Sequence, residues 1–256
     1  MSQNVVMPYR YAAPSFDDTD LKAYWKFNET SGDIINVSEA TADLGSGADL
    51  QVTGATYNDT TSPFGYGMSL DGVNDYLVAG TSLSQFNFMH LAGASWTVNY
   101  WVVEQTGISF GYMYNTNEYD AYKVGVASRG DSLAPDGNML VQTSNTTATE
   151  YSSGATSDMV PLLDTWYMIT TIMDYGAGAG SNVVQYRDGG NKDTTGTLSG
   201  AIPSGNAIGE FTLGARANLH DRNAKVKFTE MSVWDRILTD DEILNLWAGG
   251  SGLAIY

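Results

Sequence analysis

Polar and apolar side chains alternate along Lys225–Thr229, near the end of the chain. Because successive side chains of a strand point to opposite faces of a sheet, this alternation predicts a strand with one face on a core. The alternation does not continue through the apolar residues Met231, Val233 and Trp234, which predicts a bulge or a change of the buried face. A partner for this strand is predicted at the other end of the chain, in the aromatic segment Ala23–Phe27.

A short helix is predicted directly after the late strand. Thr239 and Glu242 have the spacing of a capping box, in which each residue bonds the backbone N–H of the other. Three apolar residues then follow at helical spacing, before Gly249-Gly250 ends the turn: Ile243, Leu246 and Trp247.

The middle of the chain repeats the strand pattern between turns. Two alternating sets are expected to face the core: Trp96, Val98, Tyr100 and Val102, and Trp166, Met168, Thr170 and Ile172. Asp71-Gly72 predicts a tight turn. Asp188-Gly189-Gly190 predicts a second hairpin turn.

Composition favours a single all-β domain. The chain has 256 residues with 28 glycines and 6 prolines, and its turn residues separate short runs rich in Val, Ile, Thr, Tyr and Trp. All-β sandwiches often reach roughly 200 to 250 residues as one unit, and no linker divides this sequence. Two curved antiparallel sheets are therefore predicted.

Several segments, taken in order, resemble the laminin-G-like domains of the concanavalin A-like lectin/glucanase superfamily. They are AYWKFNETSGD near the start, LDGVNDYLVAG, ASWTVNYWV, DTWYMITTIMD, VVQYRDGG and FTLGAR in the middle, and KFTEMSVWDRILTDDEILNLW near the end. The resemblance implies a jelly-roll sandwich with one short helix near the C-terminus. It also implies that Tyr76 and Val78, after the Asp71-Gly72 turn, enter the sandwich. It spans residues 21–247, which leaves an extended arm at residues 1–20 and a tail at residues 248–256.

Charge and cysteine content limit the partners. With 12 basic and 29 acidic residues the formal charge is −17, and such a field repels phosphate backbones, so nucleic acid is not expected as a ligand. The chain has no cysteine and only two histidines, His90 and His220, which argues against a disulfide framework and a zinc site.

The arm Met1–Asp20 predicts contact with another surface. It lacks the basic start and apolar run of a secretory signal, and no segment of the chain is long and apolar enough for a membrane span. Apolar and aromatic residues surround its two prolines, a composition that favours an extended arm lying on its own domain or on a neighbouring subunit: Val5, Val6, Met7, Tyr9, Tyr11 and Phe16.

Relatives of this fold often hold a structural calcium ion between the first loop and the last strand. By that resemblance the side-chain candidates are Glu29, Asn36 and Glu230, since Ca²⁺ prefers oxygen ligands. Two positions depart from the family pattern, at Asn36-Val37-Ser38 and Thr229-Glu230. The alternative is that these are ordinary turn and strand residues.

Tyrosines are concentrated in Gly107–Tyr122. Phe110, Tyr112 and Tyr114 stand two apart and would share one face of a strand, and Tyr119 and Tyr122 follow a polar turn. A row of tyrosines predicts either a platform for sugar rings or packing against the opposite sheet. The polar loop Asn218–Asn223, with His220, is a second candidate for ligand contacts.

A glycosidase of this superfamily needs acidic residues at alternate positions of one strand, so that nucleophile and acid face the same cleft. Glu118 and Asp120 supply two, but Tyr122 stands where the second essential glutamate is expected. One carboxylate cannot serve as nucleophile and general acid together, so the sequence predicts no enzyme.

Three classes of function remain. The first is a non-enzymatic recognition or display protein on a virion surface, either a capsid decoration or a fibre component, with glycan adhesion as an added role and with another subunit bound through Met1–Phe16. The second is a free carbohydrate-binding lectin. The third is a glycoside hydrolase, which the incomplete acid pair disfavours. The choice rests on analogy of fold, and fold alone does not determine function.

Overall fold

The computed structural model describes residues 16–80, 85–91, 93–105, 110–116, 125–131, 139–144, 149–153, 163–175, 181–198 and 209–256. Within these residues the strands are β1 (Leu21–Trp25), β2 (Leu50–Thr53), β3 (Met68–Asp71), β4 (Tyr76–Ala79), β5 (Ser95–Glu104), β6 (Phe110–Asn115), β7 (Gly125–Asp131), β8 (Met139–Ser144), β9 (Thr149–Ser153), β10 (Tyr167–Asp174), β11 (Ser181–Arg187), β12 (Asn191–Leu198), β13 (Phe211–Leu213) and β14 (Lys225–Trp234). The helices are α1 (Asp240–Trp247) and the short 3₁₀ turns η1 (Gly45–Ala48), η2 (Asn87–His90) and η4 (Ala248–Gly250).

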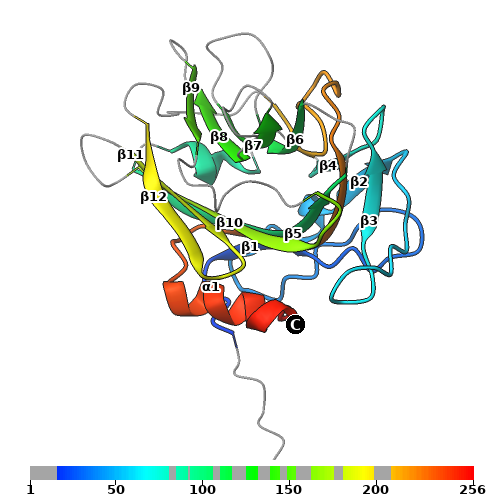
Figure 1. The fold of residues 1–256 in the computed structure, drawn as a ribbon, viewed down its shortest axis with the longest axis horizontal. Coiled ribbons are helices and arrows are strands. Elements are labelled where there is room, and N and C mark those ends of the chain that lie inside the picture. The colour runs from blue at the N-terminus through cyan, green and yellow to red at the C-terminus, as the bar shows by residue number, and fades with distance from the viewer. Residues whose placement is uncertain are drawn as a thin grey trace, which may run out of the picture.

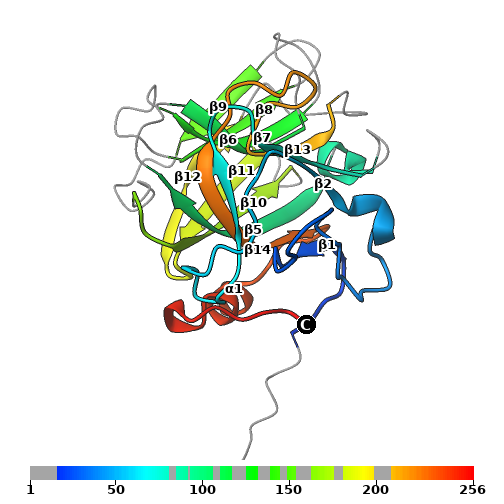
Figure 2. The same ribbon diagram turned by 90° about the vertical axis from the view of Figure 1, so that its right-hand side faces the viewer.

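The strands form two antiparallel sheets that pack face to face (Figures 1 and 2). The sheet here called the back sheet has the order β1-β14-β5-β10-β11-β12, with β3 also paired to β14. The sheet here called the front sheet has the order β2-β4-β13-β6-β7-β8-β9. This arrangement confirms the predicted sandwich of two antiparallel sheets.

Strand β14 joins the two ends of the chain. It pairs with β1 on one side and with β5 and β3 on the other, as the sequence pattern predicts for the pairing with β1. Its register against β5 shifts between Thr229 and Ser232, and Glu230 lies there with φ of 49°. The predicted bulge is therefore present, and it lets β14 bury side chains on both faces.

The core between the sheets takes its side chains from alternate positions. Trp96, Val98, Tyr100 and Val102 of β5 all belong to it, as predicted. The prediction that Tyr76 and Val78 of β4 face this core is wrong. Leu77 and Ala79 lie in the core instead, and Tyr76 and Val78 point to the outer face of the front sheet.

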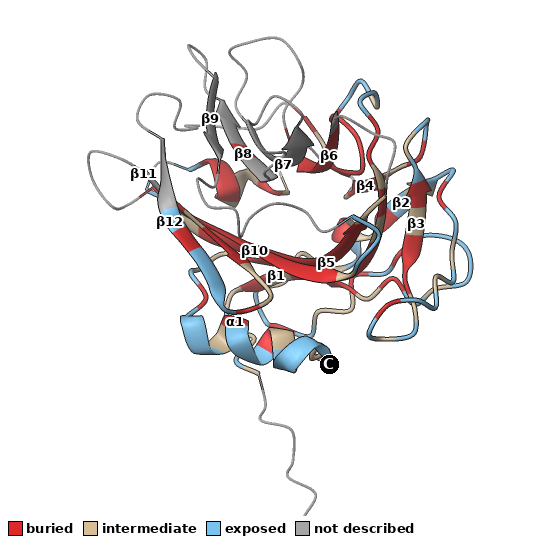
Figure 3. Cartoon of the chain, in the orientation of Figure 1, coloured by how far each residue is buried: buried red, intermediate tan, exposed pale blue. Residues whose placement is uncertain are grey.

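A second hydrophobic cluster covers the outer face of the back sheet. Helix α1 buries Ile243 and Leu246 against it, together with Met168, Ile172 and Trp234. The predicted capping box starts α1, since the Thr239 and Glu242 side chains bond each other's backbone N–H. Figure 3 shows the resulting pattern, with buried strands above a helix whose outer side is exposed. Strand β10 is therefore buried on both faces, because Tyr167 and Ile169 enter the other core.

In the part of the chain that the structure describes, every helix is too short or too polar to pass through a lipid bilayer.

Candidate functional site

The loop of residues 214–224, between β13 and β14, folds over the outer face of the front sheet. Its His220 ring stacks on Tyr76 of β4, with ring centroids 4.0 Å apart and an angle of 14° between the planes. Figure 1 shows this part of the chain in orange, on the side of the molecule away from α1. The loop therefore places His220, one of the predicted ligand-contact residues, on an aromatic partner.

The backbone of this loop is tightly constrained. Asn218, His220 and Arg222 all have positive φ, of 62°, 49° and 53°, a region that residues other than glycine rarely adopt. Gly214 starts the loop with φ of 77°, and a Cβ there would lie 2.0 Å from Leu70 Cδ2, so a larger residue does not fit. Such clustered strain persists only where the surrounding contacts fix it, and it is common at ligand sites.

Hydrogen bonds within the loop hold this conformation. The backbone N–H of Arg216 donates to the carbonyl of Asp221 (2.9 Å), and that of His220 donates to the carbonyl of Arg216 (2.9 Å). The Asn223 side chain donates to the Asp75 carbonyl (3.2 Å), which ties the loop to the turn before β4. The loop is thus closed on itself and fastened to the sheet.

Charged groups flank the stacked rings. The guanidinium of Arg216, only 5% exposed, donates to the Asp221 carboxylate, which itself faces solvent. His220 Nε2 lies 3.7 Å from Glu210 Oε2, and both side chains are partly exposed. The apolar side chain of Leu219 is 49% exposed beside them. The arrangement offers an aromatic surface with the Glu210 carboxylate at its edge.

Sequence reasoning identified His220 in this group but missed Tyr76, Glu210 and Arg216. The resemblance to the family's turn-and-strand motif wrongly implies that Tyr76 lies in the core. The sequence of β4, Tyr-Leu-Val-Ala, allows either pair to face the core, because Leu77 and Ala79 are as apolar as Tyr76 and Val78. No pattern marked Glu210 or Arg216.

The tyrosines of β6 do not share one face. The register between β6 and β7 shifts between Tyr112 and Tyr114, so Met113 is an extra residue and the alternation is interrupted. Tyr114 is fully buried in the core between the sheets, where it stacks on Phe211, and this position cannot bind a sugar ring. Tyr112 is 3% exposed and is not part of that core cluster. Of the two interpretations of the tyrosine row, packing against the opposite sheet therefore holds for Tyr114. Tyr119, Tyr122, Glu118 and Asp120 lie outside the described residues.

The three candidate calcium ligands do not form one site. Asn36 Oδ1 accepts hydrogen bonds from the backbone N–H groups of Tyr24 (2.8 Å) and Ser38 (3.3 Å). Glu230 accepts from the phenol of the same Tyr24, and also from Tyr66. Asn36 and Glu230 therefore contact opposite ends of Tyr24, and their oxygens already have protein partners.

Glu29 Oε1 accepts from the Ile35 backbone N–H (3.0 Å). Among the described residues no group of three or more His, Cys, Asp or Glu side chains is placed to hold a metal ion. The residues present do not fit a shared calcium site. Burial instead raises the pKa of Glu230 to about 7, with Tyr24 and Tyr66 hydrogen bonds acting against that rise.

Comparison with known proteins agrees with this architecture. Domain 4 of AbnA, a GH43 extracellular arabinanase from Geobacillus stearothermophilus solved in complex with arabinotriose, aligns with a TM-score of 0.62 at 15% identity, over 88% of this chain and 97% of that one. The binding domain of Paraclostridial Mosquitocidal Protein 1 aligns with a TM-score of 0.60 at 14% identity, over 89% of this chain and 52% of that one. Trypanosoma rangeli sialidase in complex with the inhibitor DANA gives a TM-score of 0.57 at 15% identity, over 89% of this chain and 32% of the enzyme.

At these identities the likeness shows the fold. This chain spans about half of the toxin binding domain and about a third of the sialidase. No protein of curated function matches the sequence. A family model described as concanavalin A-like lectin/glucanases superfamily matches residues 71–244, which is more than half of the chain. The chain therefore belongs to the concanavalin A-like lectin/glucanase superfamily.

Proposed function

We propose that this protein is a non-enzymatic recognition domain that binds a glycan on the outer face of its front sheet, around His220. The observation that carries the proposal is the strained loop that holds the His220 ring on Tyr76. Three left-handed residues in one loop are a conformational cost of about 1–3 kcal/mol each, which a loop serving only as a connection does not need.

The chemistry of the site suits a sugar. A pyranose ring has an apolar face that packs on an aromatic ring and hydroxyl groups that bond to carboxylate and guanidinium groups. Here the Glu210 carboxylate borders the stacked rings, and the Asp221 carboxylate faces solvent on the same loop. Two similar structures, domain 4 of the arabinanase AbnA in complex with arabinotriose and the binding domain of the mosquitocidal protein, support recognition as the class of function.

The absence of catalysis is part of the proposal and rests on the sequence. Glu118 and Asp120 lack a further glutamate at position 122, and these residues lie outside the described part of the chain. Release of reducing sugar from polysaccharides by the purified protein, abolished by Glu118→Gln, would contradict it.

The direct test is a glycan-array screen of the full-length protein, run once with calcium and once with a chelator. His220→Asn is the informative variant, because Asn tolerates positive φ and lacks the aromatic ring. Saturable binding that the variant loses supports the proposal. Leu244→Ala serves as a control, since Leu244 is as exposed as Leu219 but lies on α1. Equal binding by wild type and His220→Asn would place the site elsewhere.

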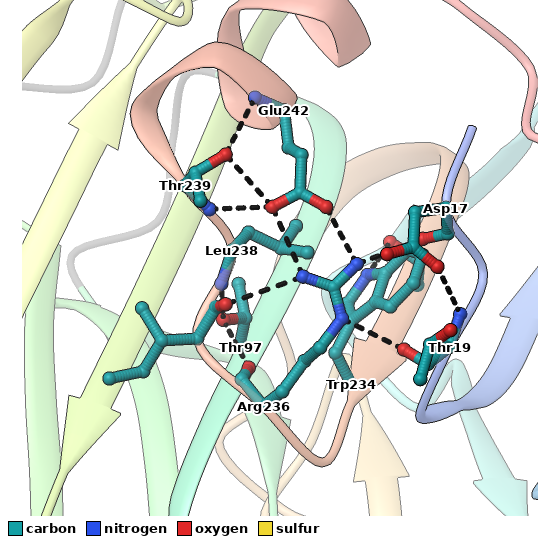
Figure 4. Close-up of polar contacts among 10 residues, drawn as sticks. Asp17, Thr19, Thr97, Trp234, Arg236, Leu238, Thr239 and Glu242 are labelled. Carbon is teal, nitrogen blue, oxygen red and sulfur yellow. Dashed lines mark hydrogen bonds and ion pairs between the residues drawn. The ribbon is translucent and has the colours of Figure 1, made fainter.

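A second part of the proposal concerns the arm. Arg236 holds the base of the arm, residues 17–19. Its Nε donates to the Thr19 carbonyl (2.8 Å) and its Nη2 donates to the Asp17 carbonyl (2.8 Å), as Figure 4 shows. The same guanidinium bonds both oxygens of Glu242 and lies 5.0 Å from the Trp234 ring centroid.

The arm base is thus held on the α1 side, away from the His220 loop. We infer that the preceding segment, residues 1–15, binds another protein subunit while the loop faces outward. The assembly we propose is a virion surface, with this protein as a decoration or fibre component, and the support for that assembly is the apolar composition of the arm joined to a single recognition domain.

Deletion of residues 1–15 tests this part. The shortened protein should keep its melting temperature and its glycan binding but no longer sediment with particles purified from the source. A free lectin would leave sedimentation unchanged by the deletion, and loss of folding would show that the arm completes the domain itself.

A further inference from the structure

Polar side chains gather in the middle of the core between the two sheets. Tyr114 of β6, Thr171 of β10, Tyr175 directly after β10 and Gln185 of β11 are all at least nine-tenths buried, with exposed fractions of 0%, 0%, 5% and 2%. Tyr114 and Tyr175 belong to the core cluster between the sheets. Thr171 faces the same way, because it alternates with Ile169 and Met173 of that cluster.

The four groups are neighbours. Thr171 and Gln185 are directly opposite each other on adjacent strands. Tyr114 lies beside Thr171, reaching it from the front sheet, and it also interacts with Tyr175. The side chains therefore converge on one region between the sheets, although they come from three strands.

None of their polar atoms has a protein hydrogen-bond partner at both good distance and good angle, although Tyr114 approaches the Thr171 side chain and Tyr175 approaches the Trp96 side chain. This holds for Tyr114 Oη, Thr171 Oγ1, Tyr175 Oη and Gln185 Nε2. The neighbouring Thr170 provides a contrast, since its hydroxyl accepts from Asn99 Nδ2 at 2.6 Å on the opposite face of β10. Buried polar groups in native proteins are nearly always satisfied, and one that is not costs the free energy of its lost hydration.

We propose that these four side chains enclose an internal hydration site that holds one or two ordered water molecules. A buried water typically makes about three hydrogen bonds, so four unsatisfied atoms match one or two waters. Water fits their chemistry because a hydroxyl both donates and accepts, whereas the Gln185 amide nitrogen only donates. A cation does not fit, since none of the four side chains is anionic, and an apolar guest would leave every polar atom unsatisfied.

A polar row connects this hydration site with the edge of the back sheet. Gln185 is directly opposite Asp193 of β12, which is 2% exposed, and β12 is the last strand of the sheet. Thr171, Gln185 and Asp193 thus form a continuous inward-facing row across three strands.

The test is oxygen-17 magnetic relaxation dispersion, which counts water molecules that stay inside a protein far longer than surface water does. Thr171→Val and Gln185→Met each remove a polar atom at nearly constant volume, and both should reduce the dispersion amplitude. Thr170→Val is the matched control, because it makes the same substitution on the opposite face of the same strand. It should leave the amplitude unchanged.

Equal amplitude in all folded variants would overturn the proposal. If the two core variants do not fold, the wild-type protein still decides the question. A crystal structure at high resolution should show water about 2.7–3.2 Å from two or more of the four atoms. Continuous side-chain density with direct hydrogen bonds among the four, and no water, would overturn the proposal as well.

Discussion

The outer faces of the two sheets are built in opposite ways. The back sheet presents apolar residues such as Met168, Ile172 and Trp234, which α1 and the two ends of the described chain cover. The front sheet presents Tyr76, and the loop of residues 214–224 packs there with charged side chains. A strand that is apolar on both faces therefore indicates a covered sheet, whereas alternation with polar residues indicates a face free for recognition.

The largest expected effect is on the covered face. Trp234→Ala removes a fully buried ring that contacts Phe16 and Arg236, and it should lower the free energy of unfolding by about 3–5 kcal/mol. Denaturant unfolding measures this loss. Leu244→Ala, on the exposed side of α1, should cost less than about 1 kcal/mol. If both variants lose the same free energy of unfolding, the hydrophobic cluster under α1 does not stabilise the fold as a core does.

The covered face should also make stability depend on pH. Burial raises the pKa of Glu230 to about 7 in the folded protein, above its ordinary value of 4.5. The folded state therefore binds more protons than the unfolded state between these values, so stability falls as pH rises through that window and stays lower above about 7. Melting temperatures measured between about pH 5 and about pH 8 should show this fall, and Glu230→Gln should reduce it. If the melting temperature of Glu230→Gln falls with pH as steeply as that of the wild type, another titrating group causes the pH dependence.

Arg236→Ala tests how firmly the arm base is held. The variant loses the bonds to Glu242, Asp17 and Thr19, and we expect a loss of about 1.5–3 kcal/mol, since these bonds involve a charged group and are partly buried. Hydrogen exchange should become faster at residues 17–21.

Lys192→Ala is the matched control, because the Lys192–Asp240 ion pair is more exposed and should contribute at most about 1 kcal/mol. Unchanged exchange at the arm base in Arg236→Ala would show that Trp234 and Phe16 hold it without the guanidinium.

The smallest effect on stability is expected on the front face. His220→Asn should change the free energy of unfolding by less than about 1 kcal/mol, because the side chain is partly exposed and Asn accepts the left-handed backbone. Its effect on glycan binding should be large. If His220→Asn strongly destabilises the fold but still binds glycan, the stacking of His220 on Tyr76 serves stability and not recognition.

The sequence pattern predicted the parts of the fold that local rules determine. The pairing of β1 with β14, the capping box of α1 and the inward face of β5 all follow from alternation and capping chemistry. The phase of β4 was wrong because its four residues include apolar side chains on both faces, and periodicity then cannot tell the core side from the outer side.

The candidate site was harder to predict, because its residues meet only through tertiary contacts. One extra residue in β6 places Tyr114 in the core and separates it from Tyr112, and no turn residue marks that bulge in the sequence. The Glu230 carboxylate was expected to bind a cation, yet its partners Tyr24 and Tyr66 come from segments far away in the chain. His220 was found because a polar loop before the last strand is itself a local signal.

The two ends of the described chain lie against each other, since the Tyr256 hydroxyl donates to the Asp18 carboxylate. In mechanical terms, a pulling force applied between these ends would first load that contact and the Arg236 bonds. Beyond them, α1 is held on the back sheet by apolar packing, whereas β1 is held by backbone hydrogen bonds to β14. The proposed recognition face belongs to the other sheet, away from the place where such a force enters the molecule.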